Sequence, residues 1–85
     1  MRYTVTWKPR AHNQLATIWM AASDRQAVTS AANAIDQQLL HDPASMGEAR
    51  SGITPVLIEP PLTVYFDVHG DDRRVDVVAV RYLRP

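Results

Sequence analysis

The 85-residue chain has no cysteine, only three glycines and one phenylalanine, and no long apolar run. Without cysteine, neither a disulfide nor a thiolate zinc site can cross-link the domain, and the composition fits a reducing compartment. A chain this short forms one domain over 1–85, because a second hydrophobic core would not fit. Since small domains bury a limited share of their surface, we expect a tightly bound partner or a homodimer.

The sequence also lacks the segments that direct a protein to a membrane. Its start, MRYTVTW, has no apolar core of the length found in signal peptides. No window approaches the 18 or so apolar residues of a membrane-spanning helix. We therefore expect a soluble, cytoplasmic protein with no membrane association.

An excess of charge is missing too, since nine Lys and Arg residues balance nine Asp and Glu residues. This balance argues against a non-specific nucleic-acid coat, which needs excess positive charge. Lys8 is the single lysine, so arginine dominates the cations. The first ten residues and the last five carry basic but no acidic side chains, and they would form a basic patch if they met in space.

The N-terminal half contains one strand pattern and two helix patterns. Apolar and polar residues alternate in RYTVTW, which predicts a half-buried strand over 2–7. Apolar residues at helical spacing, after a proline suited to a first turn, predict a helix at about 9–21. A second helix is predicted at about 24–41, with Ser23 and Gln26 as a capping box.

The C-terminal half contains strand patterns separated by turns. The composition of residues 43–52 predicts a loop. Strands are predicted over 53–59, 62–68 and 73–83, separated by the Pro-Pro pair and by the turn HGDD. The last strand is valine-rich on both faces, which predicts a central position. The order β-α-α-β-β-β predicts an α+β fold of two layers, with a helical hairpin packed on a mostly antiparallel sheet.

The stretch VRYLR at the end of the last strand is the richest in potential chemistry. An arginine such as Arg81 can hold a phosphate with two hydrogen bonds, and a neighbouring tyrosine such as Tyr82 can stack on a base or transfer a proton. In strict alternation Arg81 shares a face with Val77, whereas Tyr82 shares the other with Val78. The simpler interpretation is a solvated chain end.

Histidines and carboxylates give weaker signals. The three histidines are His12, His41 and His69. They are far apart in the sequence and follow no metal-ligand spacing, so we expect surface or capping roles for them and no metal or other cofactor. Asp71, Asp72 and Asp76 are interpreted as part of a solvated hairpin tip with local ion pairs.

In the order and spacing of its segments the chain resembles the RelE/ParE superfamily of bacterial toxins, from type II toxin–antitoxin modules that stabilise plasmids. The resemblance covers about residues 2–83. It is carried by the opening strand ending at Trp7, Pro9 at the helix start, IDQQL, the Asp-Pro break, the VYF strand and Arg81 after VDVVAV. It implies the β-α-α-β-β-β fold and a cognate antitoxin as partner.

Members of this superfamily act in different ways. Some cleave messenger RNA on the ribosome with clustered arginines and lysines and often a C-terminal tyrosine, whereas others inhibit DNA gyrase without being nucleases. For this chain the resemblance implies Arg50, Arg81 and Tyr82 as catalytic residues. The basic residues expected to bind RNA are Lys8, Arg10, Arg73 and Arg84.

The sequence departs from the nuclease pattern at two places. Thr63 stands where much of the superfamily has an arginine, and the preceding segment ITPVLIE carries no base. The general base is unassigned, Tyr82 being the only nearby candidate. Three hypotheses stay open: an mRNA-directed endoribonuclease, which we prefer; a non-nuclease toxin such as a gyrase inhibitor; and a degenerate module that only binds an antitoxin.

Overall fold

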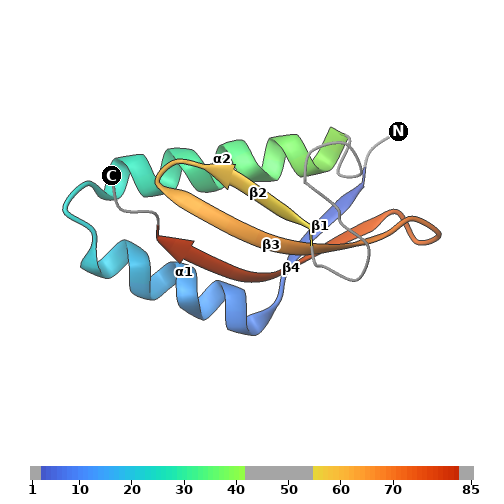
Figure 1. The fold of residues 1–85 in the computed structure, drawn as a ribbon, viewed down its shortest axis with the longest axis horizontal. Coiled ribbons are helices and arrows are strands. Elements are labelled where there is room, and N and C mark those ends of the chain that lie inside the picture. Colours follow the sequence, from blue (N-terminus) through green and yellow to red (C-terminus); the bar gives the residue numbers. More distant parts are fainter. Residues whose placement is uncertain (1–2, 42–54, 83–85) are drawn as a thin grey trace.

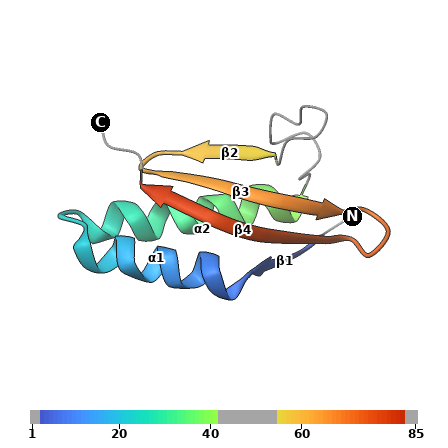
Figure 2. The same cartoon turned by 60° about the horizontal axis from the view of Figure 1, so that its bottom comes forward.

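The computed structural model describes residues 3–41 and 55–82, in which two helices lie along one side of a four-stranded sheet (Figures 1 and 2). The elements are β1 (Thr4–Trp7), α1 (Pro9–Ala21), α2 (Arg25–His41), β2 (Val56–Glu59), β3 (Leu62–His69) and β4 (Arg74–Tyr82). The predicted α+β class and element order are confirmed. Within the described ranges, neither helix has the length and apolar character needed to cross a membrane.

The sheet has the strand order β1-β4-β3-β2. β1 runs parallel to β4, while the β4–β3 and β3–β2 pairs are antiparallel, so the sheet is mixed but mostly antiparallel, as predicted. β4 lies between β1 and β3, which confirms its predicted central position. Its valines suit this place, because β-branched side chains pack well on a strand that has a neighbour on each side.

The hydrophobic core lies between the helices and the sheet. On β3, Leu62, Val64 and Phe66 alternate with more exposed residues, as expected of a half-buried strand. The other buried apolar residues are Ala11, Val28, Ala31, Ile35, Leu39, Leu57, Val75, Val77 and Val80. Full burial of each large apolar side chain contributes about 1.5–3 kcal/mol.

A β-bulge in β4 changes which face its last residues occupy. Tyr65 pairs with Ala79 and Phe66 with Val77, so Val78 is an extra residue with no partner on β3. Val77 and Val80 are consequently both buried in the core. The expectation that Arg81 shares a face with Val77 is therefore wrong, because the bulge reverses the alternation between them.

The start of α2 also differs from the predicted capping box. The helix begins at Arg25, and the Ala27 backbone N–H donates to Asp24 Oδ1 at 3.0 Å. Asp24 is thus the cap, because a capping side chain reaches the amide three residues further on. Ser23 stands one residue too early for this bond.

Candidate functional site

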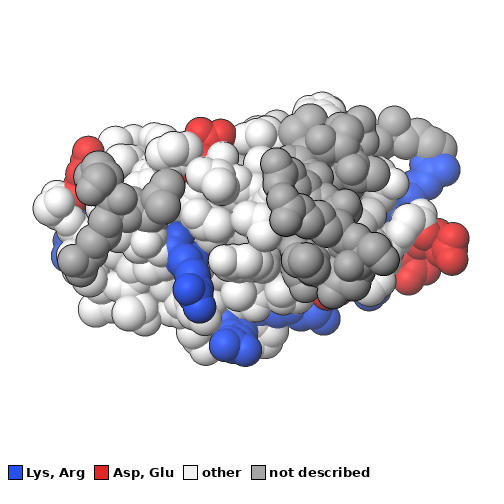
Figure 3. Space-filling view, viewed as in Figure 1, with Lys and Arg blue, Asp and Glu red and all other residues white. Residues whose placement is uncertain are grey.

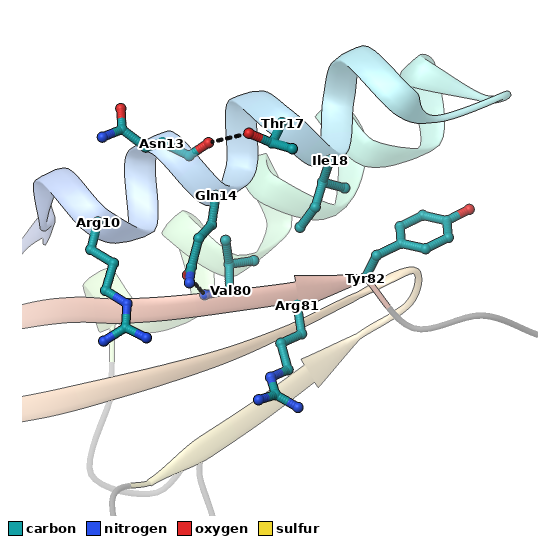
Figure 4. A pocket seen from close by; sticks show the side chains of 8 residues that line it. All are labelled: Arg10, Asn13, Gln14, Thr17, Ile18, Val80, Arg81 and Tyr82. Atoms are coloured by element: carbon teal, nitrogen blue, oxygen red, sulfur yellow. Dashed lines mark hydrogen bonds between the residues drawn. The ribbon is translucent and has the colours of Figure 1, made fainter.

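A groove of about 740 Å³ runs between α1 and the end of β4 (Figure 4). α1 contributes polar side chains from three successive turns, and β4 contributes its last three residues. The lining residues are Arg10, Asn13, Gln14, Thr17, Ile18, Val80, Arg81 and Tyr82.

The groove exists because β1 is shorter than β4. β1 pairs only with residues 74–77 of β4, and the Lys8 N–H makes a last bond to the Val77 carbonyl at 2.9 Å. Pro9 then begins α1 and takes the chain away from the sheet. Past this point Gln14 Oε1 accepts the Val80 N–H at 2.9 Å, so a side chain satisfies a backbone donor where a neighbouring strand would otherwise do so.

Two exposed arginines give the groove its charge. Arg10 comes from the first turn of α1 and Arg81 from the end of β4. In Figure 3 basic surface gathers along the lower edge of the molecule, whereas acidic surface lies at the hairpin tip and the upper edge. None of the lining residues in the described part of the chain is acidic. Such a pair of guanidinium groups suits phosphate or carboxylate oxygens.

Tyr82 is oriented differently from the arginines. Figure 4 shows Arg10 and Arg81 extending to the same side, whereas Tyr82 points away from them. Tyr82 is 40% exposed and lines an adjoining hollow of about 510 Å³ that also involves Thr17 and Ile18. The face of its ring can therefore stack on a flat group, but Arg81 and Tyr82 do not converge on one atom.

The other residues expected to form the site lie elsewhere. Lys8 Nζ is 3.6 Å from Asp76 Oδ2, outside the groove. Arg73 lies in the β3–β4 turn with φ of 50°, roughly 25 Å from Arg81 at the usual strand rise. Arg50 and Arg84 fall outside the described residues, and so does the expected pairing of Arg50 with Arg81.

Sequence reasoning missed Gln14. A signal was present, since Gln14 follows Ala11 by three residues and precedes Ile18 by four, within the apolar stripe of α1. A polar residue in such a stripe needs a buried partner, which here is the Val80 amide. In the stretches that the structure describes, no group of three or more His, Asp and Glu side chains could hold a metal ion.

Comparison with known proteins gives matches at the level of structure. No protein-family model matches the sequence, and neither does any curated protein. A chain of the RelBE2 toxin–antitoxin complex from Mycobacterium tuberculosis aligns with a TM-score of 0.79 and 14% identity, over 96% of this chain and 99% of that one. A chain of the chromosomal ParDE toxin–antitoxin system from P. aeruginosa aligns with a TM-score of 0.64 and 13% identity, over 98% of each chain. The fold expected from the RelE/ParE resemblance is thus confirmed.

Proposed function

We propose that the chain is the toxin component of a type II toxin–antitoxin module and that a cognate antitoxin neutralises it. Support comes from a fold shared, over nearly the whole chain, with chains of two such systems. The edge strand β2 also carries Ile58 with 59% of its surface exposed. An edge strand with an exposed apolar side chain is a ready surface for a partner.

Within this role we infer an endoribonuclease that acts on messenger RNA at the ribosome. The observation that carries this inference is the pair of exposed guanidinium groups, Arg10 and Arg81, in a groove whose described lining contains no acid. Guanidinium groups match RNA phosphates, and the exposed ring of Tyr82 offers a stacking face for a base.

Arg10 also accounts for the missing arginine on β3. Thr63, where much of the resembling superfamily has an arginine, pairs with Arg81 across the β3–β4 ladder. Arg10 flanks Arg81 from the opposite side, on α1. The second positive charge of the site is therefore supplied by a helix instead of by the neighbouring strand.

A non-nuclease toxin, such as an inhibitor of DNA gyrase, is the second candidate. One observation favours it: the described lining of the groove includes no His, Asp or Glu that could transfer a proton. Such a toxin would use the same groove only for binding.

Expression in a bacterial host with and without the neighbouring gene separates these functions. We expect growth arrest with cuts at codon-phased positions when transcript ends are mapped. Arg81→Ala should lower cutting roughly 10- to 100-fold, because a charge-assisted hydrogen bond to phosphate contributes about 1.5–3 kcal/mol. Arg81→Lys, which keeps the charge but not the two-pronged geometry, should fall between Arg81→Ala and the wild type.

The same experiment has two outcomes that contradict the nuclease. Growth arrest with intact transcripts and broken DNA would support gyrase inhibition. Absence of arrest, with the protein present and folded, would support a module that only binds an antitoxin.

A further inference from the structure

Outside the groove, one carboxylate is buried among three basic side chains. Asp76 on β4 is 3% exposed. Its Oδ2 lies 3.1 Å from His69 Nε2 and 3.6 Å from Lys8 Nζ, and its Oδ1 lies 3.2 Å from Arg74 Nε. The basic side chains are 41–49% exposed, so they form an accessible rim around a buried acid.

This cluster overturns the interpretation of Asp76 as part of a solvated hairpin tip. Two parts of the chain converge on it: Lys8 lies between β1 and α1, whereas His69 and Arg74 belong to the same β3–β4 hairpin as Asp76. Burying a charge costs several kcal/mol even when it is paired, and an apolar residue would pack at this position at no such cost. A buried carboxylate in contact with a half-exposed histidine therefore suggests chemistry at this position.

The contact geometry sets the orientation of the imidazole. Nε2 faces Asp76 Oδ2 within hydrogen-bond range, so Nδ1 is the ring nitrogen not committed to the carboxylate. A carboxylate that accepts from one imidazole nitrogen favours the tautomer in which the other can accept a proton. His69 is thus arranged as a general base that Asp76 orients.

The local charge argues against a simple anion-binding site. Asp67, which is exposed on β3, lies directly opposite Asp76 in the β3–β4 ladder. The charges of Lys8 and Arg74 are thus matched by two neighbouring carboxylates, and no excess positive charge collects on this part of the sheet. Arg74 is shared further, with its Nη1 4.0 Å from Asp72 Oδ2.

We propose that His69, positioned by Asp76, is the general base of RNA cleavage in this chain. The proposal rests on the endoribonuclease function and supplies the base that the described groove lining lacks. Asp76 and Arg81 lie on the same face of β4, and their partners on β3 are four residues apart, which corresponds to roughly 13 Å. One single-stranded RNA lying along β4 can reach both.

The chemical step needs no further reactant. His69 Nδ1 takes the proton of a ribose 2′-hydroxyl, and the 2′-oxygen forms a bond to the adjacent phosphorus. The bond from phosphorus to the 5′-oxygen breaks, and this oxygen takes a proton from water. The products are a 2′,3′-cyclic phosphate and a 5′-hydroxyl, and His69 returns its proton to solvent.

The test measures cleavage of mRNA in a reconstituted bacterial translation reaction at saturating and limiting toxin. His69→Gln keeps a side-chain donor for Asp76 but removes the base, so the rate constant at saturating toxin should fall at least about 100-fold. Asp76→Asn should lower the same rate constant without changing the half-saturating concentration. Arg81→Ala should instead raise the half-saturating concentration, because the groove binds RNA. His12→Gln, which alters an exposed histidine on α1, is the matched control and should be silent.

Chemical rescue separates a lost base from a loosened fold. In His69→Gly, added imidazole should restore part of the cleavage rate, which it cannot do for an unfolded chain. If the wild-type chain cuts mRNA and the His69→Gln variant cuts it equally well, the role of His69 is overturned and the proposed function stays intact. A folded His69→Gly variant that imidazole does not rescue would have the same consequence. A wild-type chain that cuts no mRNA would overturn the endoribonuclease function, and this inference with it.

Discussion

At the scale of single residues, each of the two tryptophans donates its indole N–H to a side chain on α2. Trp7 on β1 donates to Asp36 Oδ1 at 2.7 Å in a partly buried position. Trp19 on α1 donates to Thr29 Oγ1 at 3.2 Å in an exposed position. The first bond has an acidic acceptor, so it is the stronger of the two.

Replacing each tryptophan by phenylalanine tests this difference. Trp7→Phe should lower the free energy of unfolding by about 1.5–3 kcal/mol, whereas Trp19→Phe should cost only about 0.5–1 kcal/mol. Urea denaturation followed by far-UV circular dichroism measures both on the same scale. Equal losses would mean that the bond between β1 and α2 is no stronger than the exposed one.

At the scale of elements, side chains hold the link between the two helices at both ends. Asp24 accepts the Ala27 N–H at the start of α2. Arg25 donates to the Trp19 and Met20 carbonyls at 3.2 Å each, near the end of α1, and its guanidinium lies 4.7 Å from the Trp19 ring centroid. Together these contacts satisfy backbone groups that helix ends leave unpaired.

The two candidate caps of α2 can be compared directly. Asp24→Ala should reduce the free energy of unfolding by about 1 kcal/mol, because it removes the acceptor at the helix start. Ser23→Ala should change it little, since Ser23 lies before the cap position. Chemical denaturation of both variants gives the answer. A larger loss in Ser23→Ala would restore the capping box predicted from sequence.

The elements differ in how well sequence predicts them. Both helices were predicted to within about a residue, because their apolar spacing and start signals are local. The bulge at Val78 was not predicted, because it depends on how β4 aligns with β3. A register shift turns every later side chain to the other face, and for that reason Arg81 was assigned to the wrong side.

At the scale of the whole molecule, the domain is small and relies on one core. Its buried apolar residues come from both helices and from β2, β3 and β4. On the outside, Ile58 on β2 and Met20 on α1 are strongly exposed. So small a core gives limited stability, and binding to the folded state by a partner adds to it.

The proposed antitoxin should therefore raise the thermal midpoint. At a free concentration 100 times its dissociation constant, a partner that binds only the folded chain adds about 2.7 kcal/mol. For a domain of this size that corresponds to roughly 10–20 °C. Differential scanning fluorimetry with the product of the neighbouring gene measures the shift, with an unrelated protein at equal concentration as control. An unchanged midpoint would argue against this product as the partner.

The sequence alone determined the class of the fold, the element order and the central place of β4, because these follow from local periodicity and from breaks in the chain. It also proposed Arg81 as a catalytic residue and Arg10 as an RNA-binding residue, and both line the groove. Only the tertiary structure decided that these two meet, and that Lys8, His69 and Arg74 surround a buried Asp76. The groove and the contact between Lys8 and Asp76 join residues far apart in the chain, and the pairing of His69 with Asp76 crosses the β3–β4 ladder. All of them depend on strand register and on where β1 ends, which no local pattern encodes.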